Sequence, residues 1–201
     1  MRLFYKVSDK KLLRDRNELF KEAGIPALEK CKFVSRPFKN SWYGEYYSGI
    51  QGYIYEFGRV ENEDVLEIVR VYISSGDKYI KIYINVFKII HKLNLISELN
   101  SYDGLKFGIP PNNFTNMRLR SEDYKGPPLF YMFFLPQHKV GTYYTKSGYG
   151  IEIQKLKKLI KSDMENIDGF LKRWHELHKP NVTDLEGNIM PTGYESSRRV
   201  Q

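Results

Sequence analysis

Residues 50–90 read IQGYIYEFGRVENEDVLEIVRVYISSGDKYIKIYINVFKII, and the fold follows from how this stretch pairs with itself. It contains three runs of β-branched and aromatic residues, separated by short breaks rich in Glu, Asn, Asp, Ser and Gly. The runs are 50–60, 65–74 and 78–90. Strands joined by short turns of this composition pair with their neighbours as antiparallel hairpins. We therefore predict an antiparallel meander at the centre of the molecule.

Alternation along the third run divides its side chains between two faces of the sheet, because successive side chains of a strand point in opposite directions. The aliphatic face holds Ile80, Ile82, Ile84 and Val86, and the mixed face holds Lys81, Tyr83, Asn85 and Phe87. The second run is apolar on both faces, and its interruptions are Glu67 and Arg70. We expect the second run to be the central strand, covered on both sides.

Helical periodicity lies on either side of the meander. After a short strand expected at residues 2–7, Ser8 is a suitable N-cap for a helix, and Gly24 followed by Pro26 predicts its end. Near the C-terminus, apolar residues step by three or four positions, which predicts an amphipathic helix over residues 151–178. Gly169 is expected to kink or split that helix.

The remaining segments are less regular. We predict a loop with a strand end at 27–49, a short helix at 93–99, a buried strand at 129–135 and a loose hairpin at 140–150. Together these elements predict a single α+β domain over residues 1–179, with an antiparallel sheet of about five or six strands, an N-terminal helix and a long C-terminal helix packed on the sheet. The polar residues 180–201 are expected to form a docked tail.

Length and composition exclude several classes of protein. A chain of 201 residues buries enough surface to fold without a disulfide, and its single cysteine cannot form an internal bridge. No apolar run is long enough to span a membrane, and the first residues lack the apolar core of a leader peptide, so a cytoplasmic location is expected. The net charge of +8 divides evenly, with 17 basic against 13 acidic residues in 1–100 and 15 against 11 in 101–201.

Motifs for catalysis are weak. His175 and His178 are three residues apart, whereas the zinc protease helix needs a spacing of four. The triplet Asp9-Lys10-Lys11 matches the short acidic-x-Lys pattern of metal-dependent nucleases. Asp9 also lies at a predicted helix start, where a negative charge is stabilising, so the match does not require a nuclease site. Cys31 lies between two lysines that would favour its thiolate, although a structural role is more common for such a residue. Phosphate-binding and nucleophile-elbow motifs are missing, so we predict no catalytic residue, metal or cofactor.

An aromatic constellation is the strongest functional signal in the sequence. By spacing, Tyr53 and Tyr55 share one strand face, and Lys81 and Tyr83 share another. The pairs Trp42-Tyr43 and Tyr46-Tyr47 lie just upstream of the first run. If these faces coincide, the sheet presents a tyrosine-rich surface with a basic edge, suited to protein contacts because Tyr and Trp give large rigid contact areas. The alternative is that the C-terminal helix covers these rings.

Three functional hypotheses remain at this point. We favour a non-enzymatic protein-binding domain, most concretely a bacterial toxin-neutralising immunity protein that occludes its partner. The residues expected to contact the partner are Trp42, Tyr43, Tyr46, Tyr47, Tyr53, Tyr55, Lys81 and Tyr83. The second hypothesis is a nucleic-acid-binding protein that uses Lys81, Tyr83, Lys157, Lys158 and Lys161. The third is an enzyme whose site assembles from dispersed residues.

Overall fold

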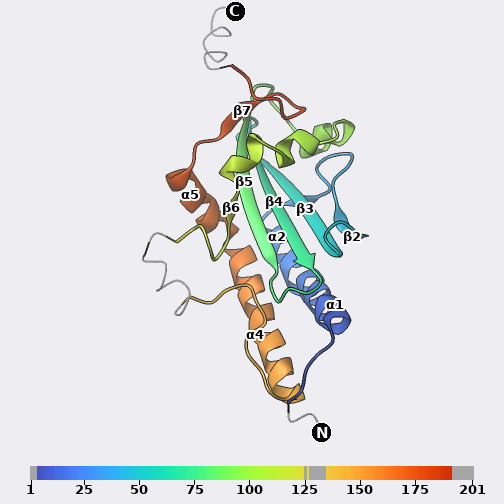
Figure 1. The fold of residues 1–201 in the computed structure, drawn as a ribbon. Coiled ribbons are helices and arrows are strands. Elements are labelled where there is room, and N and C mark those ends of the chain that lie inside the picture. Colours follow the sequence, from blue (N-terminus) through green and yellow to red (C-terminus); the bar gives the residue numbers. More distant parts are fainter. Residues whose placement is uncertain (1–3, 125, 127–134, 192–201) are drawn as a thin grey trace, which may run out of the picture.

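A computed structural model of the chain describes residues 4–124, 126 and 135–191. Within them, helices and strands combine in an α+β fold (Figure 1). The helical elements are α1 (Asp9–Leu19), η1 (Phe20–Gly24), α2 (Ile25–Lys30), η2 (Ile96–Ser101), η3 (Leu105–Gly108), η4 (Asn112–Thr115), α4 (Lys146–Glu165) and α5 (Ile167–Leu177). The strands are β1 (Val34–Ser35), β2 (Tyr43–Tyr47), β3 (Gly52–Glu61), β4 (Val65–Ser74), β5 (Lys81–Ile89), β6 (Met117–Arg118) and β7 (Asn181–Thr183).

The predicted meander is confirmed, because β3, β4 and β5 pair in sequence and antiparallel. The sheet has the order β1-β3-β4-β5-β6, with β2 also on β3 and β7 parallel to β5. The third strand begins three residues later than predicted. The reason is that Tyr79 forms an isolated bridge with Lys139, and the Ile80 amide donates to the His138 carbonyl instead of to β4.

The central strand β4 is covered on both sides, as expected. On one face, which we call the helix face, Val71 lies between Tyr55 of β3 and Ile82 of β5. The helices pack there: buried side chains of α1, α2, α4 and α5 join those of β3, β4 and β5 in the main hydrophobic cluster. The aliphatic face of β5 faces this cluster, and its four residues are fully buried. On the opposite face, Leu66 and Ile68 belong to a second apolar cluster.

The N-terminal predictions need correction. Residues 4–7 form no strand, because the Tyr5 amide donates to the Tyr144 carbonyl (2.9 Å) and not to a sheet neighbour. The first helix does not end at Gly24: α1, the wider turn η1 and α2 continue to Lys30. Pro26 is tolerated because it lies in the first turn of α2. Gly24 is helical, and a Cβ there would meet the Phe20 ring at 2.4 Å.

The C-terminal predictions also change in detail. The hairpin predicted at 140–150 is wrong, since α4 begins at Lys146 and Thr145 caps it by accepting a hydrogen bond from the Gly148 amide (2.9 Å). The break between α4 and α5 falls at Asn166 and not at Gly169. The short helix predicted at 93–99 is a 3-10 turn, η2, that starts three residues later. Residues 129–134 of the predicted buried strand lie outside the described residues.

None of the helices within the described ranges is long and apolar enough to cross a membrane.

A buried arginine ties the first helix to the hairpin between β4 and β5. Arg16 is fully buried, and its guanidinium donates to the carbonyls of Leu12 (3.2 Å), Ser74 (2.8 Å) and Tyr79 (2.5 Å). Burial lowers the pKa of Arg16 to about 10, and the negative charge of Asp77 offsets only part of this effect. The helix position is therefore fixed by polar contacts as well as by apolar packing.

The first prediction concerns Arg16. The substitution Arg16→Met keeps most of the side-chain volume but leaves buried carbonyls without a donor, so the free energy of unfolding should fall by about 2–4 kcal/mol. Urea unfolding measures this change. Arg14→Met on the exposed side of the same helix is the matched control and should change stability by less than about 0.5 kcal/mol. Equal stability of the two variants would contradict the assigned role.

The second prediction concerns Glu67, which is buried and bonded to Arg59 (2.6 Å). Burial raises the pKa of Glu67 to about 7, although Arg59 opposes the effect. Between the ordinary value of 4.5 and about 7, the folded state then binds more protons than the unfolded state. Stability should therefore fall as the pH rises through this range, and Glu67→Gln should remove that part of the slope in urea unfolding. The same slope in both proteins would refute the assignment.

Candidate functional site

The face of the sheet opposite the helices changes character along its length. Near the top of the view in Figure 1, the second apolar cluster closes this face, because the segment 93–108 packs over the ends of β4 and β5. Phe107 is central to this cover: its ring stacks on Phe38 at 5.0 Å and meets Phe87 edge-on at 4.9 Å. Further along the strands, the apolar cluster ends at a row of polar residues.

That row consists of Glu56, Arg70 and Tyr83, which lie side by side on β3, β4 and β5. The Arg70 guanidinium donates through Nε to Glu56 Oε2 and through Nη1 to the Phe107 carbonyl (3.0 Å). The Ser41 hydroxyl donates to the other Glu56 oxygen (2.7 Å). The two charged side chains are only 8% and 10% exposed, so this ion pair is buried and well bonded at the edge of the apolar cover.

Beyond the ion pair the sheet opens into a hollow lined by aromatic and polar side chains. A cavity of about 320 Å³ lies over Arg70, Tyr72, Lys81 and Tyr83, and Gly108 forms part of its wall. The Tyr72 and Tyr83 rings meet edge-to-face, with centroids 5.8 Å apart. Burial raises the pKa of the Tyr72 phenol, so this hydroxyl stays a neutral hydrogen-bond donor at physiological pH.

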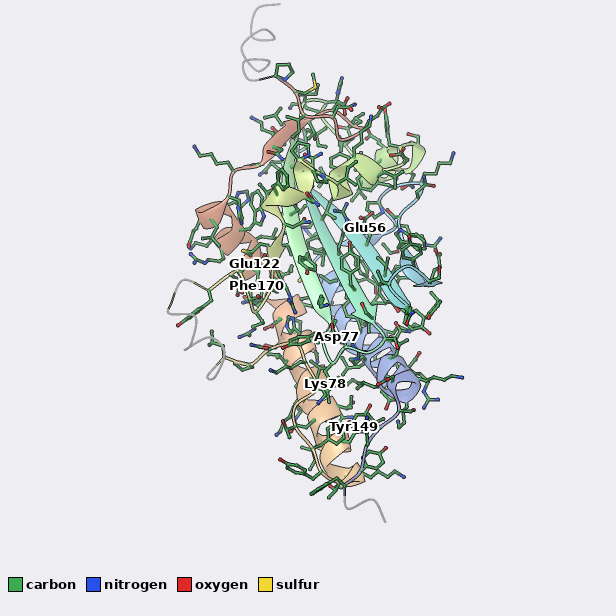
Figure 2. All side chains as sticks on the ribbon, in the orientation of Figure 1. Glu56, Asp77, Lys78, Glu122, Tyr149 and Phe170 are labelled. Carbon is green, nitrogen blue, oxygen red and sulfur yellow. The ribbon has the colours of Figure 1, made fainter. Side chains whose placement is uncertain are left out.

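A second, smaller cavity of about 190 Å³ shares Arg70, Tyr72 and Gly108 with the first. Trp42 lines its far side, and Tyr47 of β2 packs on the Trp42 ring at 4.9 Å. We call the combined area the open sheet surface. It comprises Trp42, Tyr47, Ile54, Arg70, Tyr72, Lys81 and Tyr83. Glu56 on β3, with Asp77 and Lys78 at the turn between β4 and β5, marks its two ends in Figure 2.

Exposed apolar side chains lie at the rim of this surface. Leu105 and Ile109 line the smaller cavity and are 57% and 52% exposed. Phe114, on the neighbouring turn η4, is 74% exposed. Leu105 and Ile109 thus add exposed apolar area to the wall of the smaller cavity, and Phe114 follows five residues after Ile109. The segment 93–109 therefore covers one end of the sheet with its apolar residues and borders the smaller cavity with Leu105 and Ile109.

The two aromatic strand faces do not coincide. Tyr55 lies beside Val71 on the helix face, whereas Tyr83 lies beside Arg70 on the opposite face. A shift of one residue in a strand reverses the direction of its side chains, so this register separates the two sets. The sheet thus presents no continuous surface that contains all the predicted aromatic residues.

This register decides on which face each predicted aromatic residue lies and how exposed it is. Tyr55 is 1% exposed and donates to Asn17 (2.7 Å), so it belongs to the core. Tyr43 packs edge-on against Tyr55, and Tyr53 packs against Tyr46, both on the helix-face side. Tyr46 itself is 57% exposed at the sheet edge. The residues that the structure brings together are Trp42, Tyr47, Lys81 and Tyr83.

The lysines proposed for nucleic-acid binding do not form one surface with the sheet residues. Lys157 bonds to Glu22 (2.5 Å), and the Lys161 ammonium lies 3.9 Å from Glu165. Lys158 lines a hollow between α4 and the segment 135–141, which shares Lys139 and Gly141 with a hollow beside the turn between β4 and β5. Two of the three charges are therefore compensated by neighbouring carboxylates.

The strongest arrangement of titratable groups outside the sheet is buried. His138 Nε2 lies 2.7 Å from Asp163 Oδ2, and Arg120 binds both oxygens of the same carboxylate (2.6 and 2.8 Å). Burial opposes ionisation of Asp163, but the hydrogen bonds from Arg120 and His138 outweigh it and hold its pKa below the ordinary value. Both His138 and Asp163 are only 3% exposed, and their contact joins α4 to the segment beside β5.

The remaining candidates for catalytic or metal-binding residues, among them Cys31 and His178, provide no site. Burial raises the pKa of the Cys31 thiol, and Asp168 adds to this effect, so the flanking lysines do not activate it. Within the described ranges, no group of histidine, cysteine and carboxylate side chains could hold a metal ion. His178 is half-buried against Trp174, and burial lowers its pKa.

Sequence reasoning missed Arg70 and Tyr72 as site residues. The sequence shows Arg70 as an interruption of an apolar strand. Which other side chains share its face of the sheet depends on the pairing of β4 with β3 and β5, which the sequence does not give. Leu105 and Ile109 lie in an irregular segment with no periodic signal.

Comparisons with known proteins provide no assignment: no family model matches the chain, and no curated protein or solved structure shows a significant match.

The third prediction tests the border of the open sheet surface. Arg70→Met should lower the free energy of unfolding by about 3–5 kcal/mol, because Glu56 would remain buried without its partner. The double variant Glu56→Leu with Arg70→Met removes both charges and should be more stable than the single variant. Urea unfolding of the single and double variants measures the coupling. A double variant as unstable as the sum of its two single variants would contradict this role.

Proposed function

We propose that this chain is a non-enzymatic protein-binding domain whose contact area is the open sheet surface. The observation that carries the proposal is the contrast between the two faces. α-Helices cover one face, whereas the lower half of the other, where Trp42, Tyr72 and Tyr83 gather beside Arg70, is bordered within the described residues by the short turns η3 and η4. Trp, Tyr and Arg are the residue types that contribute most to binding energy at protein interfaces.

The chemistry of the surface supports binding better than catalysis. Its phenols and indole offer rigid apolar area with polar tips. Its charged groups are held in ion pairs, Arg70 with Glu56 and Lys81 with Asp77 (2.8 Å). Ser74 and Lys81 are the nucleophile and base types that line the larger cavity, and the Lys81 ammonium is held in its ion pair with Asp77. Together with the exposed rim at Leu105 and Ile109, these features suit a partner's surface.

The more specific form of the proposal is a toxin-neutralising immunity protein. A domain of this kind needs a rigid surface that covers the partner's active site, and it needs no chemistry of its own. The three antiparallel strands and the buried ion pair between Glu56 and Arg70 support this proposal. The bacterial origin and the toxin remain parts of the proposal.

Nucleic-acid binding is the second candidate. Lys81 and Tyr83 lie on the open sheet surface, and Lys78 and Lys139 lie close to it. Phosphate binding would make the affinity fall steeply with salt, whereas binding through aromatic anchors would persist at high salt.

The fourth prediction uses two adjacent tyrosines of β2 that lie on opposite faces. Immobilised wild-type protein should retain a protein partner from its native lysate at high salt. Tyr47→Ala should lower retention by about tenfold or more, because Tyr47 supports Trp42 on the open sheet surface. Tyr46→Ala is the matched control, since this exposed ring lies on the other face.

Quantitative mass spectrometry of the eluates, with thermal unfolding to confirm that both variants fold, provides the readout. Equal retention by the two variants would place the contact elsewhere. Recovery of nucleic acid alone, and at low salt only, would favour the second candidate instead.

A further inference from the structure

Three hollows follow one another along the open sheet surface, each sharing lining residues with the next, and we call them together the groove. The smaller cavity shares Arg70, Tyr72 and Gly108 with the larger one. The cavity of about 320 Å³ in turn shares Ser74 and Lys81 with a third hollow of about 630 Å³, which lies beside the turn between β4 and β5. The groove therefore runs from Trp42, across the strands, to Lys139. A groove that crosses several strands fits an extended segment better than a compact small molecule.

The two ends of this groove differ in charge. At the turn end, Lys78, Lys81 and Lys139 line the hollow with Asp77, which pairs with Lys81. The Glu152 carboxylate, which pairs with Lys155 (2.7 Å), lies beside Gly141 at the border of this hollow. Lys78 and Lys139 form no ion pair with any carboxylate in the described part of the chain. Each instead lies near a tyrosine ring, Lys78 by Tyr143 (5.8 Å) and Lys139 by Tyr79 (5.6 Å). This end therefore has two cations that are free to meet an anion.

The Trp42 end has the opposite character. It is lined by Trp42, Leu105 and Ile109, and its charged groups are the neutralised pair Glu56 and Arg70 and the carboxylate of Asp103. A ligand that fits the whole groove must therefore be apolar at one end and acidic at the other.

We propose that the groove binds an extended segment of the protein partner that carries apolar side chains at one end and carboxylates at the other. The apolar end would lie against Trp42 and Ile109, and the carboxylates would meet Lys78 and Lys139. This inference rests on the proposed function, because it names the part of the partner that the open sheet surface recognises.

The aromatic geometry favours a peptide over single-stranded nucleic acid. Base stacking needs a ring with a free face. The Tyr79 ring is already flanked by Arg118 (5.2 Å) and Lys139 (5.6 Å), and Tyr72 and Tyr83 meet each other edge-to-face. In addition, a nucleic-acid strand would place phosphates along the whole groove, including next to Asp103. The charge pattern suits a segment of mixed composition.

The fifth prediction is a binding measurement with defined probes. The probes are fluorescent peptides with leucine and tyrosine in one half and glutamate in the other, prepared in both orders. Their glutamine analogues and an oligothymidylate of similar length complete the set. By fluorescence anisotropy, one glutamate peptide should bind wild-type protein at least about tenfold more tightly than its glutamine analogue, because only the glutamates pair with the lysines.

Charge reversal locates the contact. The double variant Lys78→Glu with Lys139→Glu should lose about tenfold or more in affinity for the glutamate peptide. Lys172→Glu, the same charge change on an exposed position of α5, is the matched control and should bind as wild type does. Lys78→Glu alone, with thermal unfolding of each variant, separates lost binding from lost folding, because Lys139 also takes part in a backbone bridge.

Several outcomes would overturn the inference: no binding of either glutamate peptide, equal binding of the glutamine analogue, an unaffected charge-reversal variant, or tighter binding of the oligothymidylate. The lysate experiment separates failure of this inference from failure of the proposed function. If the lysate partner is retained at high salt and depends on Tyr47 but not on Lys78 and Lys139, the protein-binding function stands and the acidic segment is excluded.

Discussion

The buried ion pair between Glu56 and Arg70 is the interaction on which the arrangement of this molecule depends. Two charges that leave water must find partners, and here Ser41 and the Phe107 carbonyl complete the set. The pair lies at the point where the apolar cover of the sheet ends. Arg70 holds the covering segment through Phe107 and faces both cavities on the other side. One guanidinium thus joins the closed half of the sheet to its open half.

The helix side of the sheet is held by a different mixture of forces. Apolar packing of the helices on β3, β4 and β5 supplies most of the burial, and Arg16 fixes the position of α1 against the carbonyls of the hairpin. The His138, Asp163 and Arg120 cluster performs a similar task for α4. Buried polar groups therefore set the positions of elements on both faces, while Trp42, Tyr72 and Tyr83 stay half-buried on the open sheet surface.

The α+β class, the central position of β4 and the aliphatic side of β5 could be predicted from the sequence, because each depends on local periodicity. The boundaries of β4 were predicted to the residue. The continuation of the first helix beyond Pro26 could not be predicted from the sequence, because a proline in a first helical turn has the same sequence signature as a helix end. The cap at Thr145 was likewise hidden among glycines and tyrosines.

The site was predictable only in part, for a reason of register. Spacing within a strand tells which side chains share a face, but only the pairing between strands tells whether two such faces coincide. Tyr55 and Tyr83 were each assigned correctly to a set, and the pairing placed the sets on opposite sides. Leu105 begins the single turn η3 and Ile109 follows it, and one turn is too short to show a period that would indicate their exposure.

Hydroxyl-radical footprinting with mass spectrometry tests most directly whether solvent reaches Trp42 and Tyr47 on the face of the sheet opposite the helices. The chain has two tryptophans, and the account predicts that Trp42 is modified readily while Trp174, which is fully buried, is protected. Among the tyrosines, Tyr47 should react and Tyr55 should not. Protection of Trp42 and Tyr47 equal to that of Trp174 and Tyr55 would show that the surface is covered and would contradict the account.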